Sequence, residues 1–207
     1  MEKICHDGAA LAEHEGRPVH VHGMLPGEEG IVEVHKKHGI YVGVLKELTH
    51  ASPRRKNPEE LHHLSCSPWQ VMEYPLQVEL KHALLQELFG YYTSPAQIFS
   101  EQNFGGQAPK IDFVPAENFF RYRTKVEFSF TDRNGDLPAP LALAFHVRGG
   151  GSSRVALLEG CMLASEAMNS VALAIVGRLR ELGYAARDLK TLIVRESKSS
   201  GKLLAIL

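Results

Sequence analysis

The chain has 207 residues, enough for one large domain or two small ones with a hydrophobic core. Its net charge of -1 excludes a uniformly basic nucleic-acid-binding surface, so any such site has to be a local patch. The three cysteines are too few and too widely spaced for a disulfide framework, and no apolar run suggests a membrane span or a secretory signal. We therefore expect a cytoplasmic protein with no membrane partner.

The first 48 residues read as short β-strands separated by glycines. Polar and apolar residues alternate in residues 18–22 and 31–35, and a hairpin signal at 36–39 leads into another strand at 40–45. Closely spaced short strands predict a small closed β-barrel of the OB type, a fold that commonly binds single-stranded nucleic acid. Tyr41 and the histidines of this barrel are the candidates for stacking on bases.

Residues 51–69 lack periodicity and read as a linker, with a basic core at Arg54, Arg55 and Lys56. These cations either contact phosphates or belong to an ordinary solvated linker. A helix is predicted over residues 75–89, because leucines recur there at every fourth position and a glycine follows.

Residues 119–130 alternate with the period of a β-strand. One face carries aromatic and apolar side chains suited to a core, and the other carries Arg121, Arg123 and Lys125 in a row. Regularly spaced cations on a rigid strand suit a phosphate backbone, because guanidinium groups match phosphate oxygens in two places. The alternative is a half-buried strand with an ordinary solvated face.

The remaining elements predict an antiparallel sheet with one long helix. We expect strands at 111–114, 141–148 and 155–158, a helix over 165–182, and a terminal hairpin of 191–195 with 203–207. With the barrel, the linker and the first helix, these elements make an α+β fold.

His63, Cys66 and Cys161 are candidate metal ligands. An imidazole and a thiolate at short spacing can bind zinc, but the second sulfur lies far along the chain, so the fold has to join them. The alternative is that the cysteines are small buried thiols. Neither the glycine-rich turn of a common S-adenosylmethionine (SAM) site nor a cysteine in an activating context is present.

Several short motifs occur in the order and spacing of one enzyme family. They are HDGAALA at 6–12, HGMLPGE at 22–28, SPRR at 52–55, YRTK at 122–125, LAF at 143–145, EGCML at 159–163, Asn169 and VRES at 194–197. On these residues the chain resembles the bacterial RNA 5-methyluridine (uracil-5-)methyltransferases, which act on tRNA and 23S rRNA.

The resemblance implies a TRAM-like OB barrel at 1–57, a linker and helix at 58–90, and a central RNA-binding α+β domain at 91–207. It places SAM and the catalytic residues in a C-terminal domain that this chain lacks, so we expect no methylation by these residues alone. Cys66 and Cys161 match two of the four cysteines of the family's iron–sulfur cluster, with His63 near a third position. We do not expect an intact cluster.

The sequence thus predicts the RNA-binding, substrate-positioning portion of a SAM-dependent RNA (uracil-5-)methyltransferase, with a separate catalytic domain as a possible partner. One alternative is a standalone RNA-binding TRAM or OB-type module without catalytic activity. A second is a small zinc-structured protein that uses His63, Cys66 and Cys161.

Overall fold

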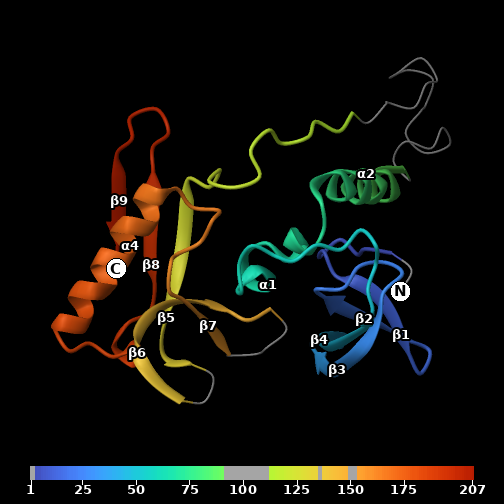
Figure 1. The fold of residues 1–207 in the computed structure, drawn as a ribbon, viewed down its shortest axis with the longest axis horizontal. Helices are drawn as coiled ribbons and strands as arrows, with labels where there is room; N and C mark the ends of the chain where they lie inside the picture. The colour runs from blue at the N-terminus through green and yellow to red at the C-terminus, as the bar shows by residue number, and fades with distance from the viewer. Residues whose placement is uncertain (1–2, 91–111, 135–136, 149–152) are drawn as a thin grey trace. The chain divides into compact units, whose positions relative to one another are not determined.

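The computed structural model describes residues 3–90, 112–134, 137–148 and 153–207 (Figure 1). The chain divides into two compact units, one of Met1–Asn57 with Trp69–Ala116 and one of Pro58–Pro68 with Glu117–Leu207. Each unit has its own β-sheet and its own buried core. The α+β class is confirmed. The division assigns residues 58–68 to the second unit and the following long helix to the first.

Four strands form the sheet of the first unit: β1 Ala10–His14, β2 Arg17–His22, β3 Glu29–Lys37 and β4 Ile40–His50. Their order is β1-β2-β4-β3, with β2 and β4 parallel and the other pairs antiparallel. The described strands leave β1 and β3 as open edges, so they do not form the closed barrel that the spacing suggested. Val19 and Val21 of β2 point into the core.

The helix α2, Tyr74–Gly90, confirms the helix expected at 75–89. Leu76 joins Leu25, Val71 and Met72 in a small core, and Leu80 packs against it, while Leu88 is exposed. The 3-10 helix η1, Pro68–Val71, precedes it. Within the described residues, none of the helices combines the length and the hydrophobicity of a bilayer-crossing segment.

A buried ion pair joins two distant parts of the first unit. The side chain of Glu28 is 0% exposed, and its carboxylate accepts hydrogen bonds from Arg55 Nε at 2.6 Å and Arg55 Nη2 at 2.7 Å. The amides of Leu25 and Ser52 donate to the same carboxylate, and Arg55 Nη2 also donates to Gly23 O. Buried charges need such full pairing, so this cluster explains why HGMLPGE and SPRR occur together.

Five antiparallel strands form the sheet of the second unit, in the order β7-β6-β5-β8-β9. They are β5 Lys125–Asn134, β6 Leu137–His146, β7 Arg154–Leu157, β8 Leu192–Glu196 and β9 Leu203–Ile206. The helix α4, Glu166–Glu181, packs on this sheet and buries Met168, Ala172 and Val176 (Figure 1). The side chain of Ser165 caps it by accepting from Met168 N. The predicted long helix and terminal hairpin are confirmed.

The strand expected over residues 119–130 begins only at Lys125. From there the alternation holds, since Val126, Phe128 and Phe130 are buried. Before it, Arg121 adopts a left-handed backbone with φ of 58°, which breaks the two-residue period. The prediction that Arg121, Arg123 and Lys125 line one strand face was therefore wrong. The strand expected at 111–114 is also not seen in its described residues, 112–114.

The loop between β7 and α4 is held by one helical side chain. Asn169 accepts from Cys161 N through Oδ1 and donates to Cys161 O through Nδ2, both at 3.0 Å. Gly160 has φ of +92°, and a Cβ built on it would lie 2.3 Å from Asn169 Oδ1. Only glycine fits this backbone and this close approach.

We predict that Glu28→Gln lowers the free energy of unfolding by about 3 kcal/mol, because it leaves the charge of Arg55 without its partner. Denaturant unfolding followed by circular dichroism measures the loss. The matched control is Glu33→Gln, which removes an exposed carboxylate paired with Lys46 and should leave stability unchanged. Equal stability of Glu28→Gln and the wild type would contradict a structural role for the pair.

The Glu28–Arg55 pair also predicts that the free energy of unfolding depends on pH. Burial alone would raise the pKa of Glu28, but Arg55 and the two amides outweigh it and hold the pKa below the ordinary value of 4.5. A depressed carboxyl pKa contributes stability that is present above the unfolded pKa and is lost as pH falls through the folded pKa. The stability difference between wild type and Glu28→Gln should therefore shrink as the pH is lowered below 4.5.

We predict that Gly160→Ala destabilises the second unit by about 2 kcal/mol, because it combines left-handed strain with a clash. The control is Gly177→Ala in α4, where a Cβ meets nothing within 4 Å and helix propensity favours alanine. Thermal unfolding of both variants tests this. A Gly160→Ala melting temperature equal to that of the wild type would show that the loop is not clamped.

Candidate functional site

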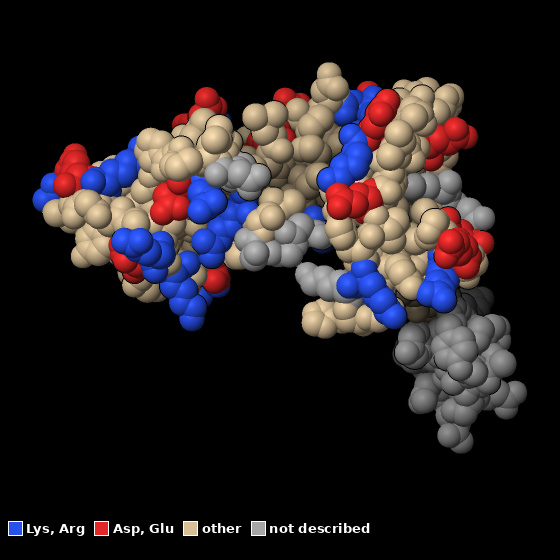
Figure 2. Space-filling model, turned by 90° about the horizontal axis from the view of Figure 1, so that it is seen from below, with Lys and Arg blue, Asp and Glu red and all other residues tan. Residues whose placement is uncertain are grey.

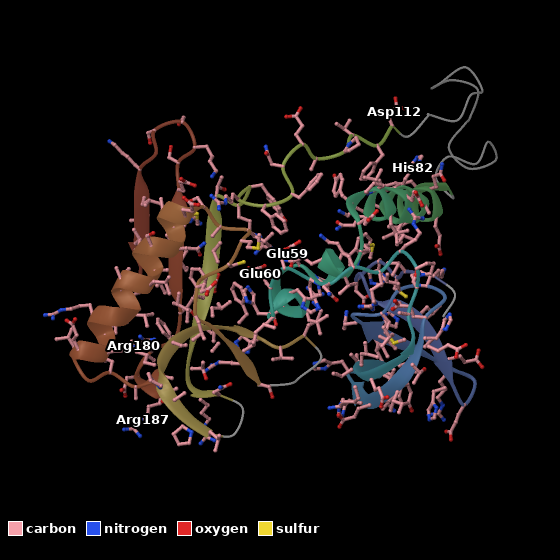
Figure 3. The ribbon with its side chains drawn as sticks, viewed as in Figure 1. Glu59, Glu60, His82, Asp112, Arg180 and Arg187 are labelled. Atoms are coloured by element: carbon pink, nitrogen blue, oxygen red, sulfur yellow. The ribbon has the colours of Figure 1, made fainter. Side chains whose placement is uncertain are left out.

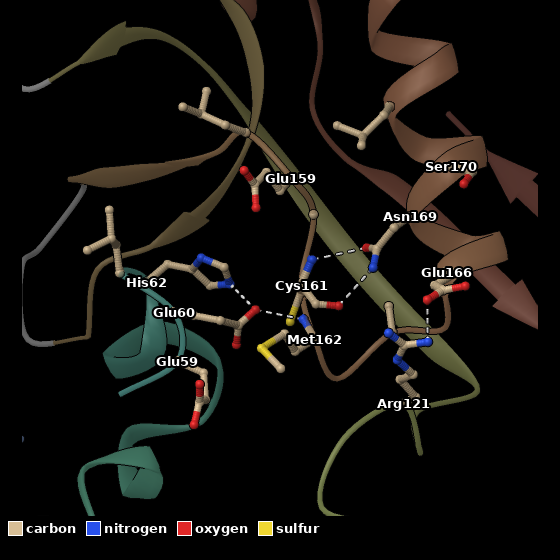
Figure 4. Close-up of a pocket in the computed structure, with 15 residues that line it drawn as sticks. Glu59, Glu60, His62, Arg121, Glu159, Cys161, Met162, Glu166, Asn169 and Ser170 are labelled. Atoms are coloured by element: carbon tan, nitrogen blue, oxygen red, sulfur yellow. Dashed lines mark hydrogen bonds and ion pairs between the residues drawn. The ribbon is translucent and has the colours of Figure 1, made fainter. Parts of the chain in front are cut away.

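Four ionisable side chains converge in the second unit. The ligand-type atoms of Glu60, His62, Cys66 and Cys161 all lie within 4.8 Å of one another. Glu60 and His62 precede the short helix α1, His63–Cys66, which ends on the cysteine, and Cys161 belongs to the loop clamped by Asn169 (Figures 3 and 4). The fold therefore joins a thiol pair that the sequence separates widely.

This cluster is buried and linked by short contacts. Glu60, His62 and Cys161 are 8%, 9% and 1% exposed. Glu60 Oε1 accepts from Met162 N at 2.6 Å and lies 3.0 Å from His62 Nε2 (Figure 4). Cys66 Sγ donates to Glu60 Oε2 at 3.5 Å. The buried Nε2 of His62 lacks a hydrogen bond of good geometry among the described residues, because its approach to Glu60 is poorly aligned.

The surroundings shift the pKa values of these groups strongly. Burial acts to lower the pKa of His62, but the contacts with Cys161 and Glu60 outweigh it and raise the pKa to about 9. The thiol of Cys66 lowers the pKa of Cys161 to about 5, and the pKa of Cys66 is raised in return by Cys161 and by burial. The two thiols therefore shift each other's pKa in opposite directions, downward for Cys161 and upward for Cys66.

The structure brings Cys66 and Cys161 together but does not include His63 among these ligands. His63 Nδ1 instead contacts Glu60 O at 2.9 Å, and His62 occupies the place expected for it. His62 and His63 lie four and three residues before Cys66, and both spacings bring side chains together on a helical turn, so spacing alone did not select His62. No spacing rule pointed to Glu60.

The cysteines present do not fit the iron–sulfur cluster that the resemblance implies. Such clusters are held by four thiolates, and the chain has three cysteines in total. Cys5 belongs to another group, with Asp7 and His20, in the first unit. The donor set around Cys66 and Cys161 is completed by an imidazole and a carboxylate instead.

A pocket of about 530 Å³ opens beside the cluster in the second unit (Figure 4). Its lining includes four carboxylates and one cation, namely Glu59, Glu60, Glu159, Glu166 and Arg121. Arg121 Nη1 is paired with Glu166 Oε1 at 2.5 Å. His62 also lines the pocket, so the carboxylates there lie beside two basic side chains.

Residues 119–125 form an exposed segment that mixes aromatic and cationic side chains. Phe119 and Tyr122 are 49% and 54% exposed, and the side chain of Arg121 is 60% exposed. The backbone is anchored, since Arg121 N donates to Met162 O at 2.8 Å and Arg123 N donates to Leu163 O at 3.0 Å. Lys125 lies 3.3 Å from Glu127, on the exposed face of β5. We call this stretch the 119–125 segment.

The candidate cations of the linker differ in what they contact. Arg55 is committed to Glu28, whereas Arg54 makes an exposed bidentate pair with Glu79 at 2.6 and 2.9 Å. Lys56 is half-buried, and its amide donates to Val71 O. Across the face in Figure 2, Lys and Arg are interspersed with Asp and Glu, as the net charge of -1 led us to expect.

Tyr41 lies on β4 between two cations that the sequence patterns did not single out. Arg17 donates to its hydroxyl and lies over its ring, 5.6 Å from the centroid. Lys36 lies 5.8 Å from the same centroid. An aromatic ring flanked by cations can offer both stacking and phosphate contacts. The parallel pairing of β2 and β4 brings Arg17 to Tyr41, and sequence spacing does not reveal such a pairing.

No protein-family model matches the chain. It is 28% identical over 171 residues to an uncharacterized RNA methyltransferase of Bacillus cereus, covering 80% of this chain and 33% of that protein. It is 25% identical to another from Halalkalibacterium halodurans, covering 100% of this chain and 44% of the relative. The 23S rRNA (uracil(1939)-C(5))-methyltransferase RlmD of Shewanella frigidimarina is 27% identical, over 88% of this chain and 38% of that protein.

The fold is also similar to a solved structure, the Pyrococcus abyssi tRNA (uracil-54, C5)-methyltransferase in complex with S-adenosyl-L-homocysteine. The TM-score is 0.65 at 18% identity, covering 99% of this chain and 44% of the other. The chain thus spans less than half the length of these relatives. The resemblance carried by the motifs is confirmed, because the chain is similar to RNA methyltransferases and, among them, to a 23S rRNA uracil-C5 enzyme.

Proposed function

We propose that this chain is the RNA-binding, substrate-positioning part of a SAM-dependent RNA (uracil-5-)methyltransferase acting on tRNA or 23S rRNA. The names of the relatives support the substrate class. In this proposal residues 1–57 act as the TRAM-like module, 58–90 as a connection and 91–207 as the central domain. In this proposal SAM binding and methyl transfer belong to a separate catalytic domain outside these 207 residues.

The main support for RNA binding is that the 119–125 segment exposes aromatic and cationic side chains. Single-stranded RNA is bound by cations that contact the phosphates and by aromatic rings that stack on the bases. Phe119 and Tyr122 supply exposed rings beside Arg121, Arg123 and Lys125. An ordinary solvated face needs only the cations, whereas exposed aromatic rings add a surface on which bases can stack.

The anchored backbone of this segment favours binding. The hydrogen bonds from Arg121 N and Arg123 N to the loop carrying Met162 and Leu163 hold the main chain in one conformation. A segment that is already ordered loses less conformational entropy on binding than a free loop does. The ion pair of Arg121 with Glu166 is exposed and therefore weak, so a phosphate can replace the carboxylate.

The first unit offers a second RNA contact at Tyr41, with Arg17 and Lys36 beside it. Of the linker cations, Arg54 and Lys56 are proposed to contact phosphate. Arg55 serves the fold through Glu28, so its loss should act on stability before it acts on RNA binding.

We predict that replacing Arg121, Arg123 and Lys125 together by glutamine weakens RNA binding about tenfold or more at moderate salt. Each lost phosphate contact should reduce the slope of log affinity against log salt by about 0.7 to 0.9, because fewer counterions are released. Fluorescence anisotropy with a uridine-containing stem-loop, repeated at several salt concentrations, measures both quantities.

The matched control replaces Arg178, Arg187 and Lys190 by glutamine. These exposed cations of the same unit lie around the C-terminal end of α4 and η2, Ala186–Asp188, away from the 119–125 segment. The control changes the net charge equally and should retain most of the affinity. If both triple variants bind RNA with the same affinity and the same salt slope, the 119–125 segment is only a solvated surface and the proposal fails.

A further inference from the structure

We propose that Glu60, His62, Cys66 and Cys161 form a mononuclear zinc site in the second unit. The site neither requires nor implies RNA binding, and it differs from the four-cysteine cluster of the family resemblance in both its ligands and its metal.

The geometry of the four side chains is close to that of a zinc site. A tetrahedral Zn²⁺ with bonds of about 2.0 to 2.3 Å places its ligand atoms about 3.3 to 3.8 Å apart. The four candidate atoms lie within 4.8 Å of one another. Glu60 Oε1 is 3.0 Å from His62 Nε2, and Cys66 Sγ is 3.5 Å from Glu60 Oε2. Shifts of side chains alone can bring this set around one ion.

The chemistry of the donors selects zinc. Two thiolates and an imidazole are soft or borderline ligands, which favour zinc and disfavour magnesium and calcium. The Nε2 atom of His62 is buried and lacks a well-aligned hydrogen bond among the described residues, as a metal-ligating nitrogen would before the ion arrives. A dication would also offset the cost of burying several acidic groups together.

Neighbouring groups hold the ligands in place, as they do around known metal sites. Asn169 fixes the backbone of Cys161 on both sides, and Met162 N donates to the carboxylate of Glu60. These contacts come from the main chain and from α4, so they do not depend on the ion. Cys161 and Glu60 are therefore positioned before metal binding.

Four protein ligands leave no open coordination position, which makes this a structural site and not a catalytic one. It joins residues 60–66 to the loop between β7 and α4. The helix α1 has only four residues and cannot be stable alone, so a metal bond at each end of residues 62–66 would contribute much of its order.

The test uses the full chain, purified without a metal-affinity tag and kept under reductant. Elemental analysis should find one zinc per chain. After zinc is removed, Co²⁺ should bind with thiolate-to-metal charge transfer and the strong visible bands of tetrahedral cobalt, and zinc should displace it. Removing zinc with a chelator should lower the melting temperature.

The variants Cys66→Ser and His62→Gln should lose zinc and show weaker cobalt bands, and Cys66→Ser should melt at the same temperature with or without chelator. His63→Gln and Cys5→Ser are the matched controls, because each removes the same residue type outside the site and should retain one zinc. Cys66 is only half-buried, so its variant should fold, which circular dichroism checks before the metal is measured.

Three results would overturn the proposal. One is a reduced, folded wild type that holds no zinc and gives no cobalt bands. Another is loss of metal in His63→Gln or Cys5→Ser with retention in His62→Gln. The third is an iron–sulfur chromophore, or a Cys66–Cys161 disulfide that forms in preference to metal binding when zinc is supplied.

Discussion

The buried carboxylate of Glu60 is the contact on which the second unit's candidate sites depend. It receives the amide of Met162 and lies against His62 and Cys66, so it fixes residues 60–66 against the loop after β7. The carbonyl of the same Met162 accepts from Arg121 N. The backbone of one residue, Met162, therefore connects the ionisable cluster to the 119–125 segment. A change that loosens the cluster should disturb the position of Arg121, although the two lie on different stretches of chain.

In the first unit, part of a basic motif that is typical of nucleic-acid binding stabilises the fold. Three successive cations at 54–56 suggest a phosphate site, but the guanidinium of Arg55 is enclosed by Glu28, Gly23 and the turn that contains Leu25. An ionised carboxylate with no exposed side-chain surface needs such a partner, and Arg55, whose side chain is 18% exposed, supplies it. In this chain, Glu28 of the first motif and Arg55 of the second motif satisfy each other's charge.

The sequence predicted the structure correctly where a repeating pattern of apolar residues or a helix-ending residue determines it. The alternation of β5, the long helix α4 and the terminal hairpin were all foreseen. It failed where the outcome depends on contacts between distant residues. The left-handed Arg121 ends the strand pattern early because its amide is held by Met162. The cluster contains His62, where the sequence had suggested His63, and it contains Glu60, which the sequence analysis did not predict. The order of residues in a short helical turn does not reveal which side chain faces Cys161. The closed barrel was expected from strand spacing, which carries no information on edge closure.

The central claim is that RNA lies along the 119–125 segment, and photo-cross-linking tests it most directly. RNA that carries 4-thiouridine would be irradiated with the wild-type chain, digested and analysed by mass spectrometry. The account predicts cross-links on Phe119 or Tyr122, with further cross-links allowed at Tyr41. Cross-links confined to other parts of the second unit, with none on the 119–125 segment, would contradict it.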